Sequence, residues 1–103
     1  MEINRLFKVL IETIDLMLNT EFYNDTTSLV QDKAVITEWY DAYKNNNRLN
    51  TISIERLVEL DNDISDIFNK YIEAEPISHN YVEILDYYFC KLKRYWKDDF
   101  NRT

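Results

Sequence analysis

Residues 81–96 read YVEILDYYFCKLKRYW, and this stretch shows the pattern on which the whole fold depends. Its apolar and aromatic side chains recur every three or four residues, and at about 100° per residue they fall within an arc of about 140°. These side chains are Tyr81, Ile84, Leu85, Tyr88, Phe89, Leu92, Tyr95 and Trp96. A stretch of this length with one apolar face predicts an amphipathic helix that packs against other helices.

Three earlier segments of the chain repeat this helical spacing of apolar residues. Together with the stretch above they predict four helices, over about residues 2–19, 28–45, 54–75 and 79–100. The connections between them are short, so helices that follow one another in sequence are expected to lie side by side. The sequence therefore predicts an all-α fold, a single helical domain over residues 1–103 built as an antiparallel up-down-up-down four-helix bundle.

Several residues mark the predicted ends of these helices. The three asparagines at 45–47 predict the end of the second helix, because asparagine tolerates the left-handed backbone that glycine usually provides. Either Thr51 or Ser53 is expected to cap the third helix. Pro76 is expected to end that helix, and Ser78 to cap the fourth.

The first segment, residues 2–19, has an unusually wide apolar stripe. Its apolar residues cover about 220° of the predicted helix surface. Such a stripe indicates burial against more than one neighbouring helix. The alternative is that part of it contacts a second copy of the chain, which would make the protein a homodimer or a larger homo-oligomer.

The composition of the 103 residues excludes several kinds of functional site. The chain has no glycine, one histidine and one cysteine. Without glycine there is no phosphate-binding loop, dinucleotide fingerprint, nucleophile elbow or calcium-binding EF-hand turn. One histidine and one cysteine do not supply the usual zinc ligand sets, and one cysteine forms no internal disulfide. We therefore expect a protein that is not an enzyme and that uses no metal and no cofactor.

The individual candidates for catalysis support this expectation. His79 directly follows Ser78, but adjacency in sequence does not place the imidazole ring on the neighbouring hydroxyl. The sequence also indicates no third member of a catalytic triad. Arg94 lies one helical turn after Cys90 and would lower the pKa of the thiol, but a catalytic thiol also needs a base. Residues 61–66, DNDISD, begin like a calcium loop but lack the glycine at its sixth position.

The charge of the chain points to a protein partner. There are 19 acidic and 12 basic residues, a formal net charge of −7. This balance disfavours nucleic-acid binding, which depends on Lys and Arg at phosphates, and favours a partner with a basic surface. The segment at residues 1–5 does not read as a signal peptide, and no run of 18 apolar residues predicts a membrane span. With a lone cysteine, these features predict a cytoplasmic protein.

The acidic residues gather on one side of the third predicted helix. Glu55, Glu59, Asp66 and Glu73 lie opposite its apolar face, and Asp63 lies at the border. Like charges four residues apart on a helix cost a few tenths of a kcal/mol per pair. A helix that tolerates this cost is expected to use the charges, and we predict that Glu55, Glu59, Asp63 and Asp66 steer a basic partner. The alternative is a plain solvated face.

Aromatic residues are the second unusual feature. The chain has eight Tyr, five Phe and two Trp. Tyr23, Tyr87 and one of Trp39, Tyr40 and Tyr43 are predicted to exceed what one small core needs, and Tyr87 falls on the polar side of its helix. Because tyrosine is enriched among the residues that anchor interfaces, we predict Tyr43 and Tyr87 as anchoring residues.

These features together predict a small helical protein that binds and inhibits another protein stoichiometrically. In size and four-helix architecture the chain is similar to bacteriocin immunity proteins, which protect the cell that produces a toxin. That similarity implies a bacterial or phage inhibitor, such as an immunity protein, an antitoxin or an anti-defence protein. The alternative is a homo-oligomeric structural or adaptor protein that associates through residues 2–19.

Overall fold

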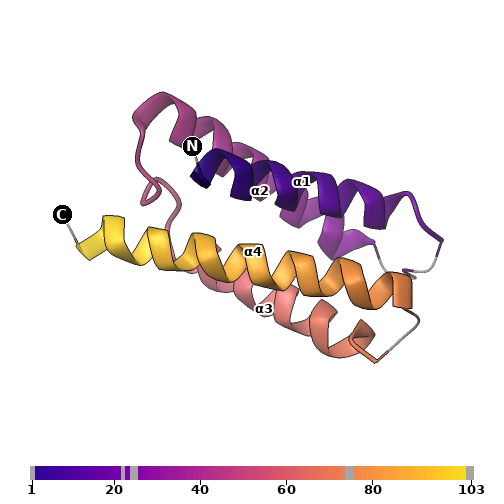
Figure 1. Ribbon diagram of the computed structural model, residues 1–103. Helices are drawn as coiled ribbons and strands as arrows, with labels where there is room; N and C mark the ends of the chain where they lie inside the picture. Colours follow the sequence, from indigo (N-terminus) through magenta and orange to yellow (C-terminus); the bar gives the residue numbers. More distant parts are fainter. Residues whose placement is uncertain (1, 22, 24–25, 74–75, 102–103) are drawn as a thin grey trace.

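The protein is a four-helix bundle (Figure 1). The computed structural model describes residues 2–21, 23, 26–73 and 76–101, and of residues 76–79 only the backbone. The helices are α1 (Glu2–Leu18), α2 (Thr27–Asn46), α3 (Ile54–Tyr71) and α4 (Pro76–Asn101). The predicted all-α class and the four predicted helices are confirmed.

The helices are arranged around a central pair. α1 packs most extensively against α4 and also against α2, while α3 packs against α4. Figure 1 shows each helix running in the direction opposite to the one before it, with both termini and the α2–α3 connection at one end. The molecule measures 42 × 23 × 20 Å, and α4, at about 1.5 Å per residue, runs along almost its whole length. α2 and α3 therefore flank the α1–α4 pair, and their mutual contact is the least extensive of the four.

The position of α1 explains its wide apolar stripe. Its buried side chains include Leu6, Phe7 and Met17, which face the two helices on either side. Leu16 remains 52% exposed. α2 and α4 of the same chain thus cover most of the apolar stripe of α1. The width of the stripe therefore no longer argues for a homodimer, and association through α1 stays a prediction.

Aromatic rings fill the space between α1 and α2. The ring of Phe7 lies edge-on to Trp39, with centroids 5.1 Å apart, and stacks on Tyr40 at 4.9 Å. Tyr23 is also buried, with its ring centroid 4.7 Å from that of Tyr71. The core therefore holds both Tyr23 and Trp39, so the aromatic surplus is smaller than the sequence predicted.

Two of the predicted helix ends are confirmed. Asn47 follows α2 with the left-handed angle φ 57°, and its N–H donates to the carbonyl oxygen of Tyr43 at 2.7 Å. Ser53 caps α3, since its hydroxyl oxygen accepts from the backbone N–H of Arg56 at 3.3 Å. Of the two cap candidates, Ser53 rather than Thr51 therefore begins the helix.

The predicted boundary between the last two helices is wrong. α3 ends at Tyr71, four residues before the expected end, and α4 begins at Pro76. Proline favours the first position of a helix because its backbone angle is already helical and that position needs no N–H donor. Pro76 therefore starts α4 instead of ending α3, and Ser78 lies inside the first turn instead of capping it.

The connection between α2 and α3 is fixed by both tryptophans. The indole N–H of Trp39 donates to the carbonyl oxygen of Leu49 at 2.7 Å, and that of Trp96 donates to Ile52 at 3.2 Å. The backbone N–H of Leu49 donates to Asp99 Oδ2 at 2.6 Å. Leu49 and Ile52 are buried, so this end of the bundle is closed and holds α2 and α3 at a set separation.

None of the helices in the described part of the chain is long and apolar enough to cross a membrane.

Candidate functional site

Ion pairs join the helices along each of their four seams. Three of them are Lys33–Asp15 at 2.6 Å between α2 and α1, Lys93–Asp61 at 2.8 Å between α4 and α3, and Lys91–Glu2 at 3.8 Å between α4 and α1. All are partly exposed and each contributes about 0–1 kcal/mol. The seam between α2 and α3 has the least extensive contact, and a row of hollows lies along it.

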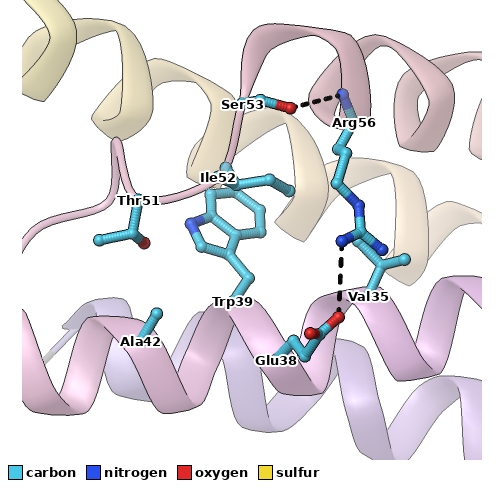
Figure 2. Close-up of a pocket in the computed structure, with 8 residues that line it drawn as sticks. All are labelled: Val35, Glu38, Trp39, Ala42, Thr51, Ile52, Ser53 and Arg56. Atoms are coloured by element: carbon cyan, nitrogen blue, oxygen red, sulfur yellow. Dashed lines mark hydrogen bonds and ion pairs between the residues drawn. The ribbon is translucent and has the colours of Figure 1, made fainter.

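The groove begins beside the connection at residues 47–53. Its first hollow, of about 310 Å³, is lined by Trp39, Ala42 and Ile52 among others. Figure 2 shows Arg56 reaching from α3 across to Glu38 on α2, where the Nη1–Oε2 distance is 3.6 Å. This ion pair bridges the groove from α3 to α2.

The middle hollow, of about 320 Å³, contains the carboxyl groups. Asp32 of α2 and Glu59 and Asp63 of α3 line it, together with the apolar Val35 and Leu60. Val35 and Arg56 line both this hollow and the first one, so the two are adjacent.

The third hollow, of about 220 Å³, continues the groove past Asp63 to Asp66 and Lys70. We call the three hollows together the α2–α3 groove. Five carboxyl groups and two cationic side chains line it, and negative charge remains in excess even without the buried Asp32: Asp32, Glu38, Glu59, Asp63 and Asp66 against Arg56 and Lys70.

Asp32 is the most unusual of these groups. It is only 3% exposed, and its Oδ2 atom has no hydrogen-bond partner among the described residues. The pKa of Asp32 is raised from 3.8 to about 8, first by burial and then by the hydrogen bond and the negative charge of Asp63. At neutral pH Asp32 is therefore protonated and hydrogen-bonded to Asp63.

Sequence reasoning missed Asp32, although the sequence contains a signal. Asp32 follows Leu29 by three residues and precedes Ile36 by four, so it lies within the apolar face of α2. A carboxyl group at such a position is expected to be buried, and buried carboxyls are rare unless they are paired. An aspartate inside an apolar stripe was thus a candidate for a buried carboxyl group with a raised pKa.

Three of the four predicted steering carboxylates line this groove. Glu59 and Asp63 lie at the middle hollow and Asp66 at the third. Glu55 is exposed in the first turn of α3, where a carboxylate also stabilises the helix through its dipole. Glu73 lies beyond the end of α3, so the acidic face is one turn shorter than predicted.

The two predicted anchoring tyrosines lie on other parts of the molecule. Tyr43 is half-buried, and its ring centroid lies 5.8 Å from that of Phe7 on α1. Tyr87 is 55% exposed on α4 and lines a separate hollow with Phe68 and Tyr88. Tyr43 thus belongs mainly to the packing between α1 and α2, while Tyr87 faces solvent as its helical position predicted.

The lone thiol is not activated. Cys90 is half-buried, its Sγ lies 4.0 Å from Asp86 Oδ1, and burial followed by the charge of Asp86 raises its pKa. The lowering effect expected from Arg94 is present but smaller. The side chain of His79, the other catalytic candidate, lies outside the described residues.

Within the described residues, no three His, Cys, Asp or Glu side chains are placed to hold a metal ion. Comparison with known proteins finds no matching family model, no matching curated protein and no matching solved structure. The function is therefore argued from the surface of this chain.

Proposed function

We propose that this protein binds another protein with a basic surface through the α2–α3 groove and the adjoining acidic face of α3. The observation that carries the proposal is the excess of carboxyl groups along three adjacent hollows of one helix seam. Elsewhere Lys33, Lys91 and Lys93 pair with carboxylates across the helix seams, whereas carboxyl groups outnumber the cations that line the groove.

Physical chemistry supports a protein partner for such a surface. Exposed carboxylates on one face attract a basic molecule over about 8 Å at physiological salt and raise the rate of encounter. A depression adds shape complementarity to that attraction, because side chains of the partner enter it and lose contact with water. Tyr87, exposed on α4, offers a second contact for a partner large enough to extend around α3.

The proposed biological role is inhibition in the cytoplasm by covering the functional basic surface of the partner in a one-to-one complex. A bacterial or phage immunity protein, antitoxin or anti-defence protein acts in this way. The support for this part is the small size, the similarity in architecture to bacteriocin immunity proteins, and a thiol whose raised pKa disfavours nucleophilic chemistry.

A capture experiment with charge-reversed variants tests the binding proposal. The full chain is immobilised, exposed to lysate of its source cells at low and high salt, and the recovered proteins are identified by mass spectrometry. The test variant carries Glu59→Lys and Asp66→Lys. The control carries Glu12→Lys and Asp98→Lys, which reverses two exposed charges outside the groove and leaves the same net charge.

We expect one basic protein in near-equal amount, lost at high salt and with the groove variant, and retained by the control. Equal loss with both variants would show that only net charge matters and would overturn the assignment of the groove. Adding the purified protein to the captured partner should then abolish the activity of the partner at a one-to-one ratio, and undiminished activity would overturn inhibition.

One observation favours the alternative, self-association in a structural or adaptor role. Ile54 and Val58 of α3 are 53% and 49% exposed and line a hollow of about 420 Å³ between α3 and α4. A second copy would cover this apolar surface in a homo-oligomer. Sedimentation at micromolar concentration separates the two functions, since a strict monomer removes the alternative.

A further inference from the structure

We propose that the middle hollow of the α2–α3 groove receives one arginine side chain of the partner, held by the carboxyl groups of Asp32 and Asp63. This inference rests on the proposed function, because it names the chemical group that the same groove recognises. It concerns a single hollow and a single side chain, so it can fail while the wider proposal stands.

The first argument is the state of Asp32. A carboxyl group that is 97% buried with an unpartnered oxygen costs free energy, and proteins normally satisfy such atoms. Its hydrogen-bond partner is Asp63, a second acid, which does not supply the cation that a pair of carboxyls prefers. Because Oδ2 is enclosed, a donor entering the hollow satisfies it when the carboxyl group of Asp32 turns toward the hollow.

The second argument is the supply of charges around Asp32. Three charged groups of α3 face it across the hollow, namely Glu59, Asp63 and Arg56. The guanidinium of Arg56 is directed to Glu38 instead (Figure 2), and the neighbouring Lys33 pairs with Asp15 of α1 at 2.6 Å. Arg56, which lines this hollow, and Lys33, which follows Asp32 in sequence, are thus engaged elsewhere, and a place for a cation remains at the acidic pair.

The third argument is the shape and lining of the hollow. Its volume of about 320 Å³ has room for a guanidinium and its stem, and Val35 and Leu60 supply apolar walls. A guanidinium is planar, weakly hydrated and able to donate two parallel hydrogen bonds to carboxylates. An ammonium is more strongly hydrated and loses more hydration free energy when it leaves water for a partly apolar hollow. Arginine therefore fits the hollow better than lysine.

Binding of an arginine would be coupled to release of a proton. When the guanidinium takes the place of the proton on Asp32, Asp32 becomes a carboxylate and the proton passes to the solvent. Affinity should therefore rise with pH until Asp32 is ionised in the free protein. A neutral side chain of the same shape would show neither the binding nor this pH dependence.

An NMR titration of the full, uniformly ¹⁵N-labelled chain tests the inference. The probe is N-acetyl-arginine amide, with N-acetyl-citrulline amide as the neutral isostere and N-acetyl-lysine amide as the ammonium control. We expect saturable shifts centred on residues 31–35 and 56–63 with the arginine probe. Its affinity should rise at least tenfold from pH 6 to pH 8, because the ionised fraction of a group with a pKa of about 8 rises by more than that.

Two variants make the assignment specific. Asp32→Asn keeps the size of the side chain and should weaken the arginine probe about tenfold, the effect of losing one charge-assisted hydrogen bond. Asp66→Asn removes a carboxylate from the third hollow and should weaken it less than twofold. A heteronuclear spectrum with unchanged dispersion shows that each variant is folded.

Three results would overturn the inference: shifts spread over the whole acidic surface, an equal response to the citrulline or lysine probe, or unchanged affinity in Asp32→Asn. Shifts of the same residues with CaCl₂ at lower concentration would assign the hollow to a metal ion and also overturn it. If the probe fails while capture of a basic protein still depends on Glu59 and Asp66, the arginine receptor is wrong and the proposed function stands. If the probe binds but no basic partner is captured, the hollow binds a guanidinium and the proposed function is wrong.

Discussion

Replacing the buried Asp32 by asparagine should change how the stability of the protein depends on pH. In the folded chain the pKa of Asp32 is raised to about 8, whereas its ordinary value is 3.8. Between these two values the folded state holds a proton that the unfolded state has released. The free energy of unfolding therefore falls as pH rises through this window, is largest on its acid side and levels off above pH 8.

The magnitude follows from the size of the window. One proton bound only in the folded state gives a slope of about 1.4 kcal/mol per pH unit. Between pH 5 and pH 8 the free energy of unfolding therefore falls by at most about 4 kcal/mol. This is a large share of the roughly 5–15 kcal/mol that stabilises a domain. Asparagine keeps the shape of the side chain and does not titrate, so Asp32→Asn removes this slope and should be the more stable protein at pH 8.

Urea unfolding followed by circular dichroism at several pH values measures this difference. Titrating groups distant from Asp32 contribute alike to both proteins, so the difference between the two curves isolates Asp32 together with its hydrogen-bond partner Asp63. Asp98→Asn, a change at an exposed carboxylate of α4, serves as the control and should run parallel to the wild type. If the wild type and Asp32→Asn also run parallel, to within about 0.5 kcal/mol from pH 5 to pH 8, then Asp32 does not carry the buried proton and the reasoning is refuted.

Three further changes have expected outcomes. Trp39→Phe leaves the buried carbonyl of Leu49 without its donor and should cost about 2–3 kcal/mol in urea unfolding, and a loss below about 0.5 kcal/mol would contradict the role of this bond in closing the connection. Ser53→Ala removes the cap of α3 and should cost about 1 kcal/mol, whereas Ser53→Asp should restore most of it. Cys90 should react with iodoacetamide at pH 8 at least about tenfold more slowly in the folded chain than in urea, because burial and Asp86 raise its pKa, and equal rates would speak against this environment.

The sequence alone determined the class and number of the secondary structure elements. The 3.6-residue spacing of apolar side chains is a local property, and it placed four helices within a few residues of their observed positions. The stop of α2 within residues 45–47 was also predicted, and Ser53 was one of the two predicted caps of α3, because each depends on the backbone preference or hydroxyl of one residue. The prediction for Pro76 was wrong because proline occurs both just after the end of a helix and at the first position of one. The path of the chain after the proline decides between these two roles.

The tertiary structure alone decided which seam stays open. Every helix had an apolar face, but the spacing did not say that α1 and α4 would pair most closely and leave α2 and α3 in looser contact. That choice turns part of an acidic helix face into a groove and brings Asp32 of α2 against Asp63 of α3, two residues 31 positions apart. The shift in the pKa of Asp32 arises from burial and from a charge on another helix, and both exist only after the chain has folded.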